Sequence, residues 1–227
     1  MQELCEFISV LSCDTVCLLP TCSQCDTLNE AMLGRLMTDE VQLIAHDATD
    51  CPMYLKKKVL QVLNSEDEDS SRTAGLSRII RIKLGARIML RRNIDITLGL
   101  VNETIATVKS VTRSVDNTDD IDKVQIILST GVEYTIERVS VKFEAMDRVY
   151  VIRKQFPICL SYGMTVHKSQ GISLQTAVVD VGNSIFTCGQ AYVALSRVTI
   201  LEGLHIINYD PASVKASKLA IIEYNRL

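Results

Sequence analysis

The pattern of apolar residues changes twice along the chain, and this change most limits the folds that the chain can adopt. Near the start, a short apolar run over residues 16–20 is followed by a polar turn. Apolar residues then recur at helical spacing, at Leu28, Met32 and Leu36. From Leu84 to about Lys154, short strand-like segments replace this pattern. From Phe156 onward, the earlier pattern of short apolar runs and helical spacing returns. This order predicts an α/β domain that is interrupted by a small all-β insert.

The segments themselves give more detailed expectations. Ser23 or Asp26 is expected to cap the first helix. Within the insert, alternating residues over 124–128 and 132–136 flank Ser129-Thr-Gly131, which predicts a hairpin. We therefore expect residues 84–154 to form a small β-barrel, and residues 1–83 and 155–227 to form the α/β domain.

The last third of the chain predicts alternating strands and helices. A strand should lead into a short helix that carries His167 and ends at Gly171. Further strands are expected at residues 177–180 and 205–207, and Asp210-Pro211 is a good helix start. Between them a helix is expected over residues 190–197, with three side chains facing inward: Tyr192, Leu195 and Ser196.

Composition excludes several classes of protein. The net charge of −3 provides no overall attraction to nucleic acid, so any DNA contact must come from a local basic surface. No apolar run approaches the roughly 20 residues that span a bilayer, and the acidic start does not match a signal peptide. We therefore expect an intracellular protein without a membrane partner, with its eight cysteines reduced.

Cys22-Ser-Gln-Cys25 has the spacing of a zinc ligand pair. A structural zinc site usually needs a second such pair, and the nearest candidates, His46 and Cys51, lie in a different segment. The sequence favours free thiols, and no metal ligand is assigned.

Donor side chains concentrate between Thr165 and Gly171, where the sequence reads Thr-Val-His-Lys-Ser-Gln-Gly. A strand-to-helix junction exposes backbone N–H groups that favour anions. His167, Lys168 and Ser169 add side-chain donors suited to phosphate oxygens. A solvated turn with a capping Thr is the simpler interpretation.

Arg197 closes the segment Tyr192-Val-Ala-Leu-Ser-Arg197. It is either a cation that stabilises a helix C-terminus by a few tenths of a kcal/mol, or an arginine finger for a γ-phosphate. A finger of that kind contributes roughly 10³ to 10⁵ in rate. Arginine suits that role because its planar fork stays charged and binds phosphate bidentately.

Residues 165–171 and 192–197 together resemble the last two signature motifs of superfamily-one DNA helicases of the Pif (petite integration frequency) type. The resemblance also covers residues 16–32, where Asn29 matches the family's Asn, and the barrel boundaries at 84–93, 99–102 and 153–157. Glu103 departs from the pattern, because the family usually has Gly after the Asn at position 102. The resemblance is nearest to Pif-like helicases of Helitron-type mobile elements.

The resemblance implies the second RecA-like domain of a P-loop-type helicase, with the inserted barrel. Such helicases hydrolyse ATP with magnesium and move 5′ to 3′ on single-stranded DNA, in DNA repair, recombination and telomere or mitochondrial genome maintenance. A nuclear or mitochondrial location follows by the same resemblance. Gln170, Gly171 and Arg197 would serve the nucleotide, with Arg197 as the catalytic residue. The expected DNA-binding residues are Thr165, His167, Lys168, Ser169, Asn29 and Asn102.

The ATP-binding half of such a helicase is not found in this sequence. None of the ten glycines is followed by Lys, so a Walker A loop is absent, and no apolar strand ends in Asp-Glu. We expect ATP and magnesium to act only in a complete helicase that includes the first RecA-like domain, and no ATP hydrolysis by this chain alone. The alternative functions are a catalytically inactive module that binds single-stranded DNA, and a protein-interaction module.

Overall fold

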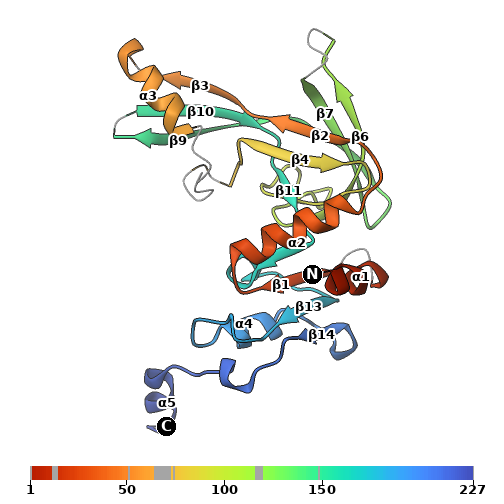
Figure 1. Ribbon diagram of the computed structural model, residues 1–227, viewed down its shortest axis with the longest axis vertical. Helices are drawn as coiled ribbons and strands as arrows, with labels where there is room; N and C mark the ends of the chain where they lie inside the picture. The colour runs from red at the N-terminus through yellow and green to blue at the C-terminus, as the bar shows by residue number, and fades with distance from the viewer. Residues whose placement is uncertain are drawn as a thin grey trace. The chain divides into compact units, whose positions relative to one another are not determined.

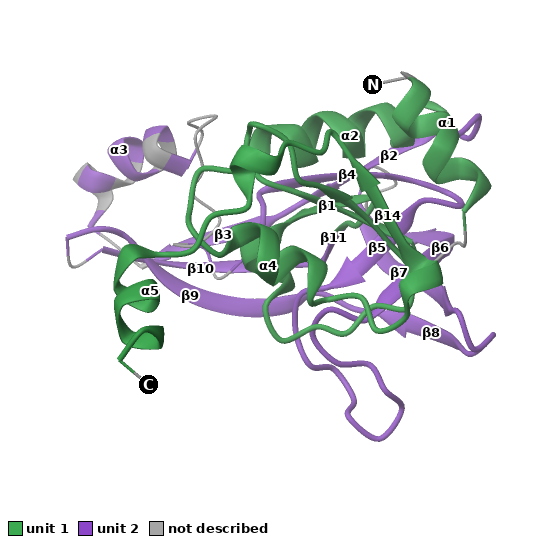
Figure 2. Cartoon of the chain, turned by 90° about the horizontal axis from the view of Figure 1, so that it is seen from below, with its two compact units in different colours: residues 1–35, 160–227 green, residues 36–159 purple. Residues whose placement is uncertain are grey.

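The computed structural model describes residues 2–11, 15–50, 52–63, 73, 75–115, 120–147 and 149–226. The chain divides into two compact units (Figure 2). Unit 1 comprises Met1–Arg35 and Leu160–Leu227, and unit 2 comprises Leu36–Cys159. The expected acidic loops at 64–73 and 116–122 lie largely outside the described residues.

Unit 1 is built on a four-stranded parallel sheet with the order β12-β1-β13-β14. Its strands are β1 (Val16–Leu19), β12 (Gly163–Thr165), β13 (Ala177–Asp180) and β14 (Leu204–Ile207). All residues of β1, β12 and β13 are buried, as expected for parallel strands that are covered on both faces. The helices α2 (Cys22–Gly34) and α4 (Gln190–Leu195) of this unit are labelled in Figure 1, and Figure 2 shows them on opposite sides of β1. Unit 1 therefore has the α/β structure that the sequence predicts for both ends of the chain.

Helix α2 begins one residue after Thr21, which is its N-cap and accepts a hydrogen bond from the backbone N–H of Gln24. The expectation that Ser23 or Asp26 caps this helix is therefore wrong. The Thr21 hydroxyl also donates to the Gln24 side chain at 2.8 Å, which adds a second contact within the first turn. Leu28 and Met32 face the core as predicted, together with residues of α1 (Gln2–Val10), which the sequence analysis did not predict.

The segments after β12 are shorter than a regular helix. Residues Val166–Ser169 form a single 3-10 turn, η1, and Gly171 follows at a φ of 91°. Further 3-10 turns are η2 (Leu201–Gly203) and η3 (Pro211–Ser213), and the described chain ends with α5 (Lys218–Tyr224). Asp210 caps η3 by accepting from the backbone of Ala212, so the predicted helix start is confirmed as a short turn.

Among its described residues, unit 2 contains three sheets and the helix α3 (Met53–Leu63). The largest sheet has the order β11-β5-β6-β7-β8. It comprises β5 (Arg87–Leu90), β6 (Ile105–Arg113), β7 (Ile121–Leu128), β8 (Glu133–Ile136) and β11 (Ile158–Leu160). The predicted hairpin is β7–β8, and Gly131 takes the left-handed conformation that its turn requires, with a φ of 82°.

The other two sheets of unit 2 join residues that are far apart in sequence. Strand β10 (Val149–Gln155) pairs with both β9 (Val139–Met146) and β3 (His46–Asp50). Strand β2 (Glu40–Ile44) pairs with β4 (Ile79–Lys83). Val59 and Leu63 of α3 pack with apolar residues of β9 and β10. Residues 36–83, which the sequence analysis assigns to the α/β domain, are therefore part of unit 2.

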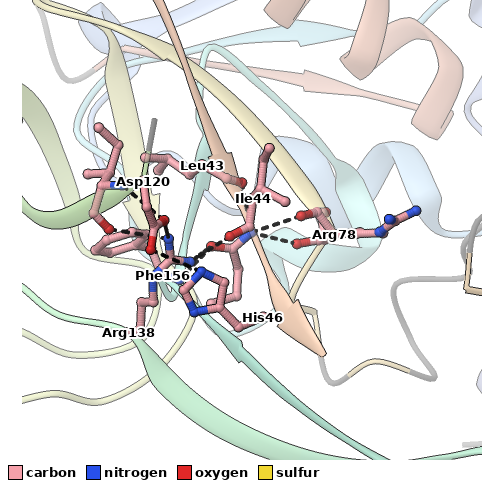
Figure 3. A network of polar contacts seen from close by, with 10 residues as sticks. Leu43, Ile44, His46, Arg78, Asp120, Arg138 and Phe156 are labelled. Atoms are coloured by element: carbon pink, nitrogen blue, oxygen red, sulfur yellow. Dashed lines mark hydrogen bonds and ion pairs between the residues drawn. The ribbon is translucent and has the colours of Figure 1, made fainter. Parts of the chain in front are cut away.

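A network of polar contacts connects these sheets (Figure 3). Gln155 is fully buried and donates to the carbonyl oxygens of Leu43, Ser77 and Arg78. Arg138 donates to the Ile44 carbonyl at 2.7 Å and forms an ion pair with Asp120. These polar groups bind partners from separate strands, and so they fix the ends of β2, β4 and β10 together.

Within the described residues, every helix is too short or too polar to cross a membrane.

Candidate nucleotide and nucleic-acid site

The turn after β12 is built by two buried hydroxyl groups. Thr165 is 6% exposed, and its Oγ1 accepts from the backbone N–H of Lys168 at 3.4 Å. Ser169 is fully buried, and its Oγ donates to the carbonyl oxygen of Val166 at 2.7 Å. Both side chains thus stabilise η1 through hydrogen bonds to its backbone.

Val166 is buried between these hydroxyls, whereas the other side chains of the turn are exposed. His167, Lys168 and Gln170 are exposed, and Gly171 lies beyond them at positive φ. A turn of this shape places an imidazole, an ammonium and an amide at one surface, next to backbone N–H groups. The arrangement provides donors for an anion without a nearby carboxylate from the same turn.

Asn29 anchors this turn to α2. Its Oδ1 accepts from the backbone N–H of Gly163 at 2.9 Å, and its Nδ2 donates to the carbonyl oxygen of Gly163 at 3.2 Å. A Cβ added at Gly163 would lie 3.3 Å from the Cα of Cys25, so helix and strand approach closely here. Asn29 therefore uses both ends of its amide to fix β12 against the helix.

Arg197 lies two residues beyond the end of α4 and contacts the segment that follows Gly171. Its Nε donates to the Val193 carbonyl at 3.0 Å, and a terminal nitrogen donates to the Ile172 carbonyl at 3.5 Å. The strand-like bridge between Leu174 and Val198 holds the two segments together. Among the described residues no carboxylate pairs with Arg197. The guanidinium is half-buried, next to the Gln170–Gly171 turn, and keeps its charge available.

An open pocket of about 280 Å³ lies between η1 and the start of α4. Its lining includes Val166, His167, Gln170, Thr187, Cys188, Gly189, Gln190, Tyr192 and Val193. Gln190 is 4% exposed, and its Oε1 accepts from the backbone N–H groups of Phe186 and Thr187. Gln190 thereby organises the loop that forms one wall of the pocket.

Two exposed aromatic residues stand beside this pocket. Phe186 is 66% exposed, and its ring centroid lies 5.9 Å from that of His167. Tyr192 is 74% exposed, which contradicts the expectation that it faces inward; Ser196 is exposed as well. The inward face of α4 consists of Gln190, Ala191 and Ala194. The two alanines are small and permit close packing there. The sequence analysis did not identify Phe186 or Gln190.

Comparison with known proteins relates this chain to one family of helicases. Residues 74–110 match the family described as DNA helicase Pif1, 2B domain. The ATP-dependent DNA helicase PIF1 of Danio rerio is 34% identical over 152 residues, which cover 67% of this chain and 23% of the relative. The crystal structure of Pif1 helicase from Candida albicans superposes with a TM-score of 0.72 at 28% identity, covering 99% of this chain and 53% of that one.

The chain is a relative of the C-terminal part of Pif1 helicases.

Its fold is the α/β helicase fold, which a second structure also supports. Pif1 helicase from Bacteroides in complex with ADP-AlF3 and single-stranded DNA superposes with a TM-score of 0.64 at 19% identity, covering 100% of this chain and 50% of that chain. The chain thus spans about a quarter of the curated Pif1 relative and about half of the Pif1 structures.

Asn102, the remaining expected DNA-binding residue, lies in unit 2, within the segment that matches the Pif1 2B domain. Its backbone N–H donates to the Asn93 side chain at 2.7 Å, and its own side chain is exposed. Glu103, where the Pif-type resemblance leads to Gly, has a φ of 74°. The backbone therefore keeps the left-handed conformation that glycine adopts most easily.

The described residues contain no group of three or more His, Cys, Asp or Glu side chains that could hold a metal ion.

Proposed function

We propose that this chain supplies the DNA-gripping and γ-phosphate-sensing part of a Pif1-type ATP-dependent 5′–3′ DNA helicase. The observation that carries the proposal is the arrangement in unit 1: exposed donors on η1 stand beside an Arg197 that contacts the same segment and has no carboxylate partner among the described residues. In this proposal residues 84–154 are the inserted barrel, which the Pif1 2B match over residues 74–110 supports.

The proposed roles divide the site residues into two groups. His167 and Lys168 contact the DNA backbone directly, Gln170 and Gly171 connect that contact with the nucleotide, and Arg197 senses the γ-phosphate. The second group consists of Thr165, Ser169 and Asn29, whose side chains already form hydrogen bonds within the protein. We assign these three residues the role of positioning the first group. Asn102 contributes to DNA binding from unit 2.

ATP and magnesium belong to the complete helicase in this proposal. The 227 residues contain no Gly-Lys pair for a Walker A loop, so the γ-phosphate and the metal would be held by a first RecA-like domain. The partners of this chain are then that domain and single-stranded DNA, in an intracellular compartment such as the nucleus or the mitochondrion. DNA repair, recombination and telomere maintenance are the processes proposed for the complete enzyme.

The absence of a Gly-Lys pair also favours a second candidate function. In it, the chain binds single-stranded DNA without hydrolysing ATP, as a module derived from a mobile-element helicase. Both candidates require the η1 surface to bind DNA, and they differ in whether Arg197 meets a nucleotide held by another domain.

The DNA contact is tested by titrating a fluorescent single-stranded oligonucleotide with the purified chain at several salt concentrations. Lys168→Ala should weaken binding and lower the slope of log K against log salt by about 0.7, because one phosphate contact on a single strand is lost. Lys218→Ala removes the same charge from an exposed position on α5 and should leave the slope unchanged. Equal slopes for all three proteins would refute the assignment of Lys168.

A further inference from the structure

Two cysteines occupy the first turn of α2, and no part of the proposed function uses them. Cys22 is the first residue of the helix and is exposed, whereas Cys25 is 5% exposed and belongs to the core of unit 1. Both are free thiols in the structure. An accessible thiol three residues before a buried one, at the start of a helix that follows a β-strand, is an arrangement typical of redox-active thiol pairs.

A bond between these two sulfurs requires a small change in the backbone of the first turn. Side chains three residues apart on a helix have their Cβ atoms about 5–6 Å apart, and a disulfide needs about 3.5–4.5 Å. The first turn must therefore tighten by about 1–2 Å. Two hydrogen bonds of this turn are long: Thr21 accepts from the N–H groups of Gln24 and Cys25 at 3.3 Å each.

The surroundings of Cys25 keep it unreactive until a partner sulfur reaches it. Burial raises the pKa of the Cys25 thiol to about 12, and the neighbouring Cys22 and Asp26 add to the rise. The Lys168 ammonium acts in the opposite direction and favours the thiolate. Cys25 is thus shielded from external reagents but lies near a cation that stabilises its attacking form.

We propose that Cys22 and Cys25 form a reversible redox modification site, in which exposed Cys22 reacts first with a low-molecular-weight disulfide and buried Cys25 then closes an intramolecular disulfide.

The two steps balance as ordinary thiol–disulfide exchange. The Cys22 thiolate attacks one sulfur of glutathione disulfide, forms a mixed disulfide and releases one glutathione thiolate, which takes up the proton lost by Cys22. The Cys25 thiolate then attacks the Cys22 sulfur and releases the second glutathione, which takes up the proton of Cys25. The protein loses two electrons and two protons, and one glutathione disulfide becomes two glutathione thiols.

Closure of this disulfide changes the support of the η1 turn. The Cys25 Cα lies at the closest approach of α2 to Gly163, and Gln24 in the same turn donates to Ser184 at 3.3 Å. A tighter first turn shifts both contacts. The modification step itself does not depend on the proposed helicase function.

The test is incubation of the purified 227-residue chain with glutathione disulfide, followed by alkylation, protease digestion and mass spectrometry. The peptide that contains Cys22 and Cys25 should lose two hydrogens and regain them with dithiothreitol. In Cys25→Ala, Cys22 should instead retain one glutathione. In Cys22→Ser, Cys25 should carry about tenfold less glutathione than Cys22 does in Cys25→Ala, because Cys25 is buried.

Cys188 is the internal comparison, since it is exposed and has no cysteine within four residues. It should stop at the mixed disulfide in every variant. The proposal is overturned if the wild-type chain stops there too at Cys22, or if both thiols remain open to alkylation. Should Cys25→Ala fail to fold, the wild-type peptide and the surface variant Cys22→Ser decide the question.

Discussion

At the scale of single residues, the backbone conformation of Glu103 is set by the turn in which it lies. Its φ of 74° lies in the left-handed region, where a side chain with a Cβ is strained. Its backbone N–H donates to the Leu90 carbonyl at 2.8 Å, so the surrounding turn holds it there. The hydrogen bonding of the turn offsets the strain, and the strained conformation of Glu103 is kept.

Replacement of Glu103 by Gly should therefore stabilise unit 2. Glycine adopts positive φ without steric cost, and we expect Glu103→Gly to raise the free energy of unfolding by about 1 kcal/mol. Glu103→Ala keeps the Cβ and should give almost no gain. Urea denaturation of the three proteins measures the difference. A gain shared by Ala and Gly would assign the effect to the glutamate charge instead.

Asn29 illustrates how a residue of a motif can act through the backbone. Its amide bonds both the N–H and the carbonyl of Gly163, so Asn29→Ala leaves two backbone groups of β12 without their partner. We expect a loss of about 1–3 kcal/mol in the free energy of unfolding, measured by chemical denaturation. Oligonucleotide affinity at low temperature, where the variant is folded, should fall less than in Lys168→Ala. A stable variant that no longer binds DNA would show direct contact.

At the scale of elements, the long-range pairing of β3 with β10 depends on one buried ion pair. Arg153 is fully buried, and two of its nitrogens each donate to a different oxygen of Asp47 at 2.8 Å. A third nitrogen donates to the Leu76 carbonyl, and the guanidinium lies over the Phe143 ring. These contacts join β3, β9 and β10 at the point where Arg153 and Asp47 face each other in register.

Asp47→Ala should consequently destabilise the chain by about 3–5 kcal/mol, because it removes the carboxylate that accepts two hydrogen bonds from the buried Arg153 guanidinium. The matched control is Glu137→Ala, which breaks the exposed pair with Lys123 and should cost less than about 1 kcal/mol. Thermal or urea unfolding compares the two. Similar small losses would mean that water enters and replaces Asp47.

Elements with strong local signals could be predicted from sequence, and those set by distant partners could not. β1, β13 and the β7–β8 hairpin follow from short apolar runs and from Gly131. Arg153 was recognised only as part of a motif, because its partner Asp47 lies in a segment without apolar alternation. Strand β9 alternates apolar and polar residues, and this signal is present in the sequence. Strand β10 carries no such signal, because it buries Arg153 and Gln155 and exposes Tyr150 and Ile152.

The sequence predicts which residues the turn after β12 contains, but not which of them are buried. The order of residues 165–171 indicates an anion-binding turn, yet no spacing rule separates the buried hydroxyls of Thr165 and Ser169 from the exposed Lys168. That separation depends on the 3-10 geometry of η1. Tyr192 was misplaced because α4 is only 6 residues long and buries its small residues.

At the scale of the whole molecule, the proposed γ-phosphate sensor has no matching phosphate-binding loop within these 227 residues. Arg197 lies beside the Gln170–Gly171 turn, but the 227 residues contain no Gly-Lys pair of a Walker A loop that would bind a triphosphate. An arginine finger accelerates phosphoryl transfer only when the phosphates and the metal are already positioned. A guanidinium alone therefore has no transition state to stabilise.

The chain should accordingly show no ATP turnover above background, with or without saturating single-stranded DNA, in a coupled steady-state assay. The matched variants are Arg197→Ala and Arg226→Ala, since Arg226 is exposed and pairs with Glu223 in the same helical segment. All three proteins should be equally inactive. Turnover that co-elutes with the chain, survives in Arg226→Ala and disappears in Arg197→Ala would show that the polypeptide binds and hydrolyses ATP by itself, through a phosphate site other than a Walker A loop.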